Sequence, residues 1–90
     1  MNLPYIQSEL FRELVGMEVL FKPEYSWYIT KRSNGAMKAI LIKKHGVFKW
    51  WKYEFHLNTL NIMKQSDITA EINRIWQAIP AECKKLNTWI

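Results

Sequence analysis

The sequence has a single cysteine and no long apolar run, and each shortage excludes a class of protein. Cys83 alone permits neither an internal disulfide bond nor a cysteine-rich zinc site, which agrees with a reducing compartment. The first residues, Met-Asn-Leu-Pro-Tyr, have neither the charged region nor the apolar stretch of a signal peptide, and no later segment is long enough for a membrane span. We therefore expect a cytoplasmic protein that does not associate with a membrane.

Residues suited to catalysis are also scarce. His45 and His56 are the only histidines, and the HExxH, CxxC and GxGxxG spacings are absent. The few glycines leave no loop to cradle a phosphate, and no further ligands accompany the histidines to form a metal site. We predict that the protein is not an enzyme and uses neither a metal nor another cofactor. The alternative is a small ribonuclease toxin in which His56 acts as an acid or base on RNA.

Acidic residues are missing from a long central segment. Residues 25–53 contain seven cations and no Asp or Glu, whereas the rest of the chain contains six cations and eight acids. The net charge of +5 therefore comes from this segment. A one-sided electrostatic field of this kind attracts polyanions and raises the rate at which they encounter the protein.

The overall composition is that of a folded protein. Ninety residues, 49% of them hydrophobic and 23% charged, predict one small α+β domain that spans residues 1–90. Apolar residues recur at helical spacing in residues 3–14, and Gly16 marks the end of this N-terminal helix. Residues 17–21 alternate weakly and indicate a strand that ends before Pro23.

Three further segments predict an antiparallel meander, so that the sheet has three or four strands. They are rich in aromatic and β-branched residues, and turn sequences separate them. The strands are residues 27–31, 36–43 and 47–57, and the turns are Ser33-Asn34-Gly35 and His45-Gly46.

The C-terminal part predicts a pair of helices that packs on one face of the sheet. Ser66 or Asp67 caps the first helix, and Pro80 separates it from the second because proline interrupts helical hydrogen bonding. The apolar face at helical spacing comprises Ile68, Ile72, Ile75, Trp76, Ile79, Cys83, Leu86 and Ile90.

Alternation in the third strand predicts its register. Trp51 and Phe55 lie on the apolar side and are expected in the core, with Tyr53 and Leu57, while Lys52, Glu54 and His56 face solvent. Phe48 and Trp50 fall with the polar set. Either a bulge near residues 50–51 restores the parity, or these two rings stand exposed among lysines.

The combination of cations with aromatic rings indicates binding to nucleic acid. Lysine and arginine neutralise phosphates, and unpaired bases stack on flat side chains. We therefore predict a non-catalytic protein that binds a nucleic acid or a nucleoprotein complex through residues 25–53. The alternative explanation is that the rings form the core and the lysines keep the strands soluble. The candidate binding residues are Lys31, Arg32, Lys38, Lys43, Lys44, Lys49, Trp50 and Lys52.

A second function class is a protein-binding inhibitor. The chain carries five Trp and four Tyr, residues that are enriched at the centres of protein interfaces. The terminal Trp89-Ile90 either completes the core or anchors another chain. Such a protein resembles the accessory proteins of phages and mobile elements, some of which block nucleoprotein machines.

The predicted order of elements, a helix, three strands and a helix, resembles that of double-stranded-RNA-binding domains. Those domains carry a basic cluster at the start of the last helix. The corresponding segment here, Ser66-Asp67-Ile68-Thr69-Ala70-Glu71, is acidic. The sequence therefore assigns the chain to no family.

Overall fold

The computed structural model describes residues 3–33, 35–57 and 59–85. The predictions for Asn34, Leu86, Trp89 and Ile90 lie outside these ranges. The α+β class is confirmed, with two helices and an antiparallel sheet. The helices are α1 (Leu3–Met17) and α2 (Gln65–Ala78), the strands are β1 (Tyr25–Lys31), β2 (Met37–His45) and β3 (Phe48–Leu57), and single 3₁₀ turns are η1 (Glu18–Leu20), η2 (Thr59–Asn61) and η3 (Ala81–Cys83).

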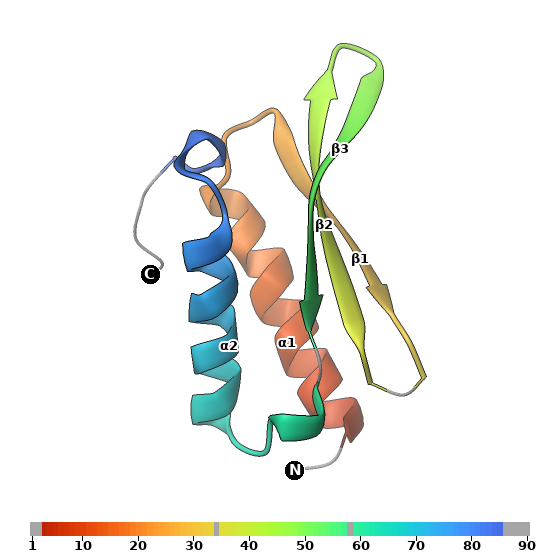
Figure 1. Ribbon diagram of the computed structural model, residues 1–90, viewed down its shortest axis with the longest axis vertical. Coiled ribbons are helices and arrows are strands. Elements are labelled where there is room, and N and C mark those ends of the chain that lie inside the picture. Colours follow the sequence, from red (N-terminus) through yellow and green to blue (C-terminus); the bar gives the residue numbers. More distant parts are fainter. Residues whose placement is uncertain (1–2, 34, 58, 86–90) are drawn as a thin grey trace.

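The two helices form one layer and the sheet forms the other (Figure 1). The strand order is β1-β2-β3, so β2 is hydrogen-bonded on both sides and the other two strands are edges. Both helices cover the same face of the sheet and leave the opposite face uncovered (Figure 1). We call these the helix-covered face and the open face.

The core lies between the helices and the helix-covered face. Each helix buries residues spaced three or four apart, as the sequence predicted, and β2 contributes alternate residues to this core. The predicted apolar face of α2 is confirmed over its whole length, and Cys83 in η3 is also buried. The core includes Ile6, Leu10 and Leu14 from α1, Met37, Ala39 and Leu41 from β2, Leu57 from β3, and Ile68, Ile72, Ile75 and Trp76 from α2.

The weak strand predicted at residues 17–21 does not form, and the described sheet has three strands. Met17 ends α1, η1 follows, and Phe21 makes an isolated bridge with Lys84. The backbone here pairs with residues 83–85, because the Lys22 N–H donates to the Cys83 carbonyl and the Lys85 N–H to the Leu20 carbonyl, both at 2.8 Å. This segment therefore satisfies its hydrogen bonds without joining the sheet.

The start of α2 is capped by Asp67 from the third helical position. Its Oδ2 accepts hydrogen bonds from the Met63 N–H at 3.0 Å and the Lys64 N–H at 3.2 Å. Asp67 therefore caps the helix, as predicted, but from within the first turn, because the residue at the N-cap position is Lys64. At the other end, the predicted break at Pro80 is confirmed, but in the described residues a single 3₁₀ turn, η3, follows it in place of the second predicted helix.

A β-bulge in β3 changes the register that the sequence predicted. Leu41 pairs with Tyr53 and Ile42 pairs with Trp51, so Lys52 is the extra residue. The bulge lies slightly beyond the predicted position at residues 50–51, and it turns Trp51 to the open face, where 61% of it is exposed.

The prediction that Trp51 belongs to the core is therefore wrong. Beyond the bulge, Leu57 is buried, and Tyr53 and Phe55 are half-buried and pack against the core. Lys52 and His56 are exposed, as predicted.

Two tryptophans give a matched test of this register. Trp76 is fully buried at 0% exposure, so Trp76→Ala should lower the free energy of unfolding by about 3 to 5 kcal/mol. Trp51→Ala should change it by less than about 0.5 kcal/mol, because exposed substitutions usually have small effects. Urea denaturation of both variants measures the difference, and equal losses would contradict the placement of Trp51 on the open face.

Tyr25 predicts a loss of stability at alkaline pH. Burial raises the pKa of Tyr25 to about 12, and the neighbouring Cys83 thiol adds to the shift. Because a tyrosine in the unfolded chain has a pKa of about 10, its contribution to stability is complete below that pH and declines as the pH rises towards 12. Unfolding free energies across this range should fall more steeply for the wild type than for Tyr25→Phe. If the unfolding free energies of the two proteins fall in parallel with pH, ionisation of Tyr25 does not contribute to the loss of stability.

Candidate nucleic-acid interface

The hairpin of β2 and β3 extends past the rest of the molecule (Figure 1). The first residue of β1, Tyr25, pairs with Lys43, so β2 continues beyond the end of β1. Gly46 opens the two-residue turn with a φ of 62°, a conformation that favours glycine. We call the projecting part, residues 43–52, the arm.

The arm exposes Phe48 and Trp50, the two rings that fall with the polar residues in the alternation of the third strand. Phe48 is 69% exposed and Trp50 is 59% exposed. The bulge at Lys52 does place both rings on the side of the sheet that the helices occupy, but the helices end before the arm (Figure 1). A bulge and exposed rings were predicted as alternatives, and the structure has both.

Two lysines of the arm lie directly opposite each other. Lys44 pairs with Lys49 across the hairpin, and like charges in this position destabilise a sheet. None of the seven cations in residues 25–53 forms an ion pair with a carboxylate of the described chain. The arm is therefore a concentration of positive charge that no described acid neutralises.

A small hollow lies on the arm. Its volume is about 210 Å³, and its lining consists of Lys43, His45, Trp50 and Lys52. Lys43 is held beside the core, with its Nζ 5.7 Å from the centre of the Tyr25 ring. We call this feature the arm hollow. The sequence treated His45 only as a turn residue, and its place in the hollow depends on the length of β2.

The open face of the sheet carries a second group of rings. Tyr28 is 57% exposed and Trp51 lies on the same face, where the Lys38 Nζ is 5.6 Å from the centre of the Trp51 ring. Ile40 is only 1% exposed although no helix covers this face, so neighbouring side chains cover it. We call Tyr28, Ile40, Ile42 and Trp51 the open-face cluster.

The remaining predicted cations lie at the other end of the sheet. The Lys31 Nζ sits 4.5 Å from the centre of the Phe11 ring, and the Arg32 carbonyl accepts a hydrogen bond from Gln7 Nε2 at 3.1 Å. Arg32 and Lys38 line a hollow of about 400 Å³ together with His56. The eight predicted residues thus divide into five on the arm and three at the opposite end.

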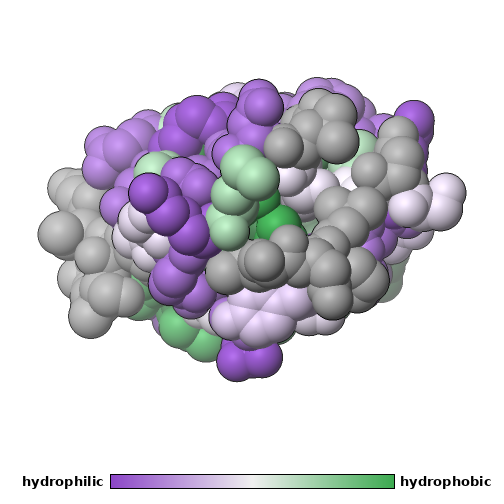
Figure 2. All heavy atoms as spheres, turned by 90° about the horizontal axis from the view of Figure 1, so that it is seen from below, coloured by the Kyte–Doolittle hydropathy of each residue, from purple (hydrophilic) through white to green (hydrophobic). Residues whose placement is uncertain are grey.

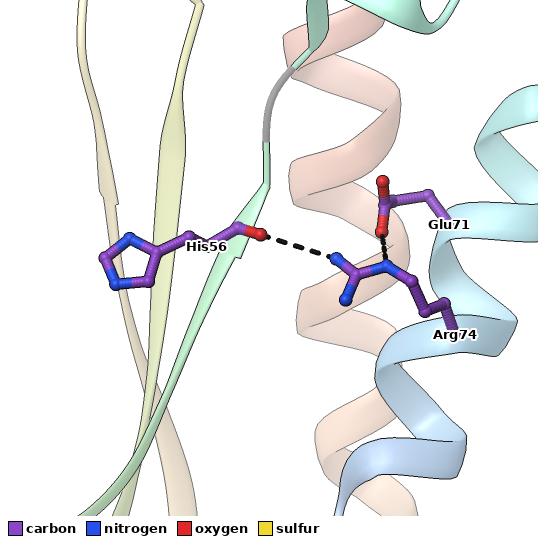
Figure 3. A network of polar contacts seen from close by, with 3 residues as sticks. All are labelled: His56, Glu71 and Arg74. Atoms are coloured by element: carbon purple, nitrogen blue, oxygen red, sulfur yellow. Dashed lines mark hydrogen bonds and ion pairs between the residues drawn. The ribbon is translucent and has the colours of Figure 1, made fainter.

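The opposite end is polar and contains a network that joins α2 to β3. Viewed from that end, hydrophilic side chains cover most of the surface that the structure describes (Figure 2). Arg74 of α2 forms an ion pair with Glu71 and donates from Nη2 to the His56 carbonyl at 3.3 Å (Figure 3). The His56 ring points away from this network and lies 3.5 Å from Glu54.

The structure places no obvious ligand set for an ion near these groups. Within residues 3–33, 35–57 and 59–85, no three His, Cys, Asp or Glu side chains come together as a metal site would require. No helix in the described ranges has both the length and the apolar character that crossing a membrane requires.

Comparisons with protein-family models, with curated proteins and with solved structures find no match to this chain. The function must therefore be inferred from the arrangement of its side chains.

The opposed lysines give a test of the arm's electrostatics. Replacing Lys49 with glutamate turns a like-charge pair into an opposite-charge pair, so Lys49→Glu should raise the free energy of unfolding by about 0.2 to 1 kcal/mol. Lys49→Gln only removes the repulsion, so its free energy of unfolding should lie between those of Lys49→Glu and the wild type. Urea denaturation at low salt measures the order. If Lys49→Glu is less stable than the wild type, repulsion between Lys44 and Lys49 does not destabilise the arm.

Proposed function

We propose that this protein is a non-catalytic, cytoplasmic nucleic-acid-binding protein, and that its target is a nucleic acid or a nucleoprotein complex. The observation that carries the proposal is the arm, where Lys44 and Lys49 lie opposite each other and Trp50 is exposed beside Lys43 and Lys52. Like charges that lie directly opposite each other in a sheet reduce its stability. A bound polyanion removes that loss because it neutralises both charges at once.

Nucleic acid fits this surface better than other polyanions do. Its phosphates bind lysines and release counterions, and its bases stack on rings such as Trp50 and Phe48. Lysine is a point charge without the planar fork that arginine uses to read base edges. Because all four cations of the arm are lysines, binding should depend little on nucleotide sequence.

Salt dependence tests this proposal. If about three to five phosphates are contacted, the logarithm of the binding constant should fall against that of salt concentration with a slope of roughly −2 to −4. The double variant Lys44→Gln with Lys49→Gln should flatten the slope by about 1.4 to 1.8, since each phosphate contact contributes about 0.7 to 0.9. Fluorescence anisotropy with a labelled oligonucleotide measures both slopes.

The matched control for this experiment removes two charges from the helix layer. Arg12→Gln with Lys64→Gln reduces the net charge by the same amount but leaves the arm unchanged, because Arg12 lies on α1 and Lys64 precedes α2. Its slope should equal that of the wild type. If both double variants lose the same amount, net charge alone explains the attraction and the arm is not the binding surface.

The open-face cluster favours a second candidate function, a protein-binding inhibitor that blocks a nucleoprotein machine, as phage and mobile-element accessory proteins do. Tyr28 and Trp51 present exposed rings beside Ile42 on a face that no helix covers. Aromatic residues of this kind dominate the binding energy at protein interfaces. Capture of a protein partner that tolerates high salt and is lost in Trp51→Ala would favour this function over the first.

Absence of catalysis is a separate expectation. The ribonuclease alternative requires the exposed His56 to act with Glu54, its neighbour at 3.5 Å. We expect no cleavage of RNA or DNA by the wild type when intact and cleaved strands are separated on a gel. Cleavage that disappears in His56→Ala but persists in His45→Ala would replace the binding proposal with the ribonuclease alternative.

A further inference from the structure

We propose that the arm hollow binds one unpaired nucleotide of a single-stranded nucleic acid. The base stacks on Trp50, and Lys43 and Lys52 bind the adjoining phosphate. This inference rests on the proposed function, because it names the part of the nucleic acid that the arm recognises.

The lining of the hollow supplies both parts of such a site. Trp50 and Lys52 are two residues apart in β3, and with Lys43 and His45 from β2 they surround a space of about 210 Å³. Lys43 is the cross-strand partner of Trp50 and lines the same hollow, with its Nζ 5.7 Å from the centre of the Tyr25 ring. A planar group on the ring therefore has cations beside it, which matches the charge of a nucleotide.

The exposed ring favours a nucleotide that has left the stack. In a duplex, neighbouring bases cover both faces of every base, and only phosphates and groove edges remain accessible. In a single strand, a base is free to lie on an aromatic side chain. Trp50 thus adds affinity for single strands, whereas the lysines attract single strands and duplexes alike.

The other face of the arm indicates a strand and not a free nucleotide. Lys44 and Lys49 lie on the face opposite Lys43 and Trp50, because successive strand residues point to opposite sides. The β3 side of the arm is a free edge, and β2 and β3 lie about 5 Å apart. A strand that passes over its free edge therefore places phosphates near both sets of lysines.

The experiment compares a single-stranded oligothymidylate with a duplex of equal length by fluorescence anisotropy. Trp50→Ala should weaken the single strand by about 5- to 150-fold and the duplex by less than about 2-fold. Trp50→Phe should restore most of the affinity because it keeps a ring. The control is Tyr5→Ala, which removes an exposed ring from α1 and should leave both affinities unchanged.

Two further ligands sharpen the assignment. An oligomer of the same length made of abasic units should bind the wild type and Trp50→Ala equally, since it has phosphates but nothing to stack. Thymidine monophosphate should compete only at concentrations at least about 100-fold above the oligomer, because it lacks the phosphates that Lys44 and Lys49 would bind. Competition at equal concentration would overturn the assignment to a strand.

The outcomes separate this inference from the proposed function. If the wild type binds neither single strands nor duplexes, both fail. If both ligands bind with a slope that depends on Lys44 and Lys49, but Trp50→Ala weakens them equally or not at all, only the nucleotide site is overturned. A loss of single-strand affinity confined to Trp51→Ala would overturn it as well, since that result moves stacking to the open face.

Discussion

The pairing of β2 along both of its edges is the constraint on which the rest of the structure depends. Its residues Met37, Ala39 and Leu41 form the floor of the core, and both helices pack above them. The last residues of the same strand, Lys44 and His45, continue past β1 and pair with β3. One strand therefore supports a buried part, where packing constrains the residues, and a short projecting end, where packing constrains them little.

The helices and the strands followed from the sequence because their signals are local. The spacing of Ile68, Ile72 and Ile75 is set by one helix and its contact with one core. Register failed at Trp51, because the bulge at Lys52 depends on how β3 aligns with β2 and no residue at that position requires it. Residues 17–21 failed for a similar reason, since Phe21 and its neighbours pair with the distant Lys84 and its neighbours.

The candidate site was predicted in composition but not in arrangement. The positive charge of residues 25–53 can be read directly from the sequence, because the segment has no acids, and Trp50 was expected among its lysines. Whether two lysines oppose each other, as Lys44 and Lys49 do, depends on the position of the turn at Gly46. Whether a ring such as Tyr28 is covered depends on which face of the sheet the helices pack against. Both facts belong to the assembled structure and not to any local pattern.

The lysines of the arm also lie next to the free edge of β3. An unpaired strand edge is a template for strands from other molecules, and natural proteins often protect such edges with lysine. Near His56 the contact from Arg74 occupies the backbone, but the arm lies beyond the helices. Two arms that approach edge to edge bring Lys49 and Lys52 of each molecule together and repel. Salt screens this repulsion as it screens attraction to an anion, so the salt concentrations that would weaken the proposed binding of nucleic acid should also favour aggregation.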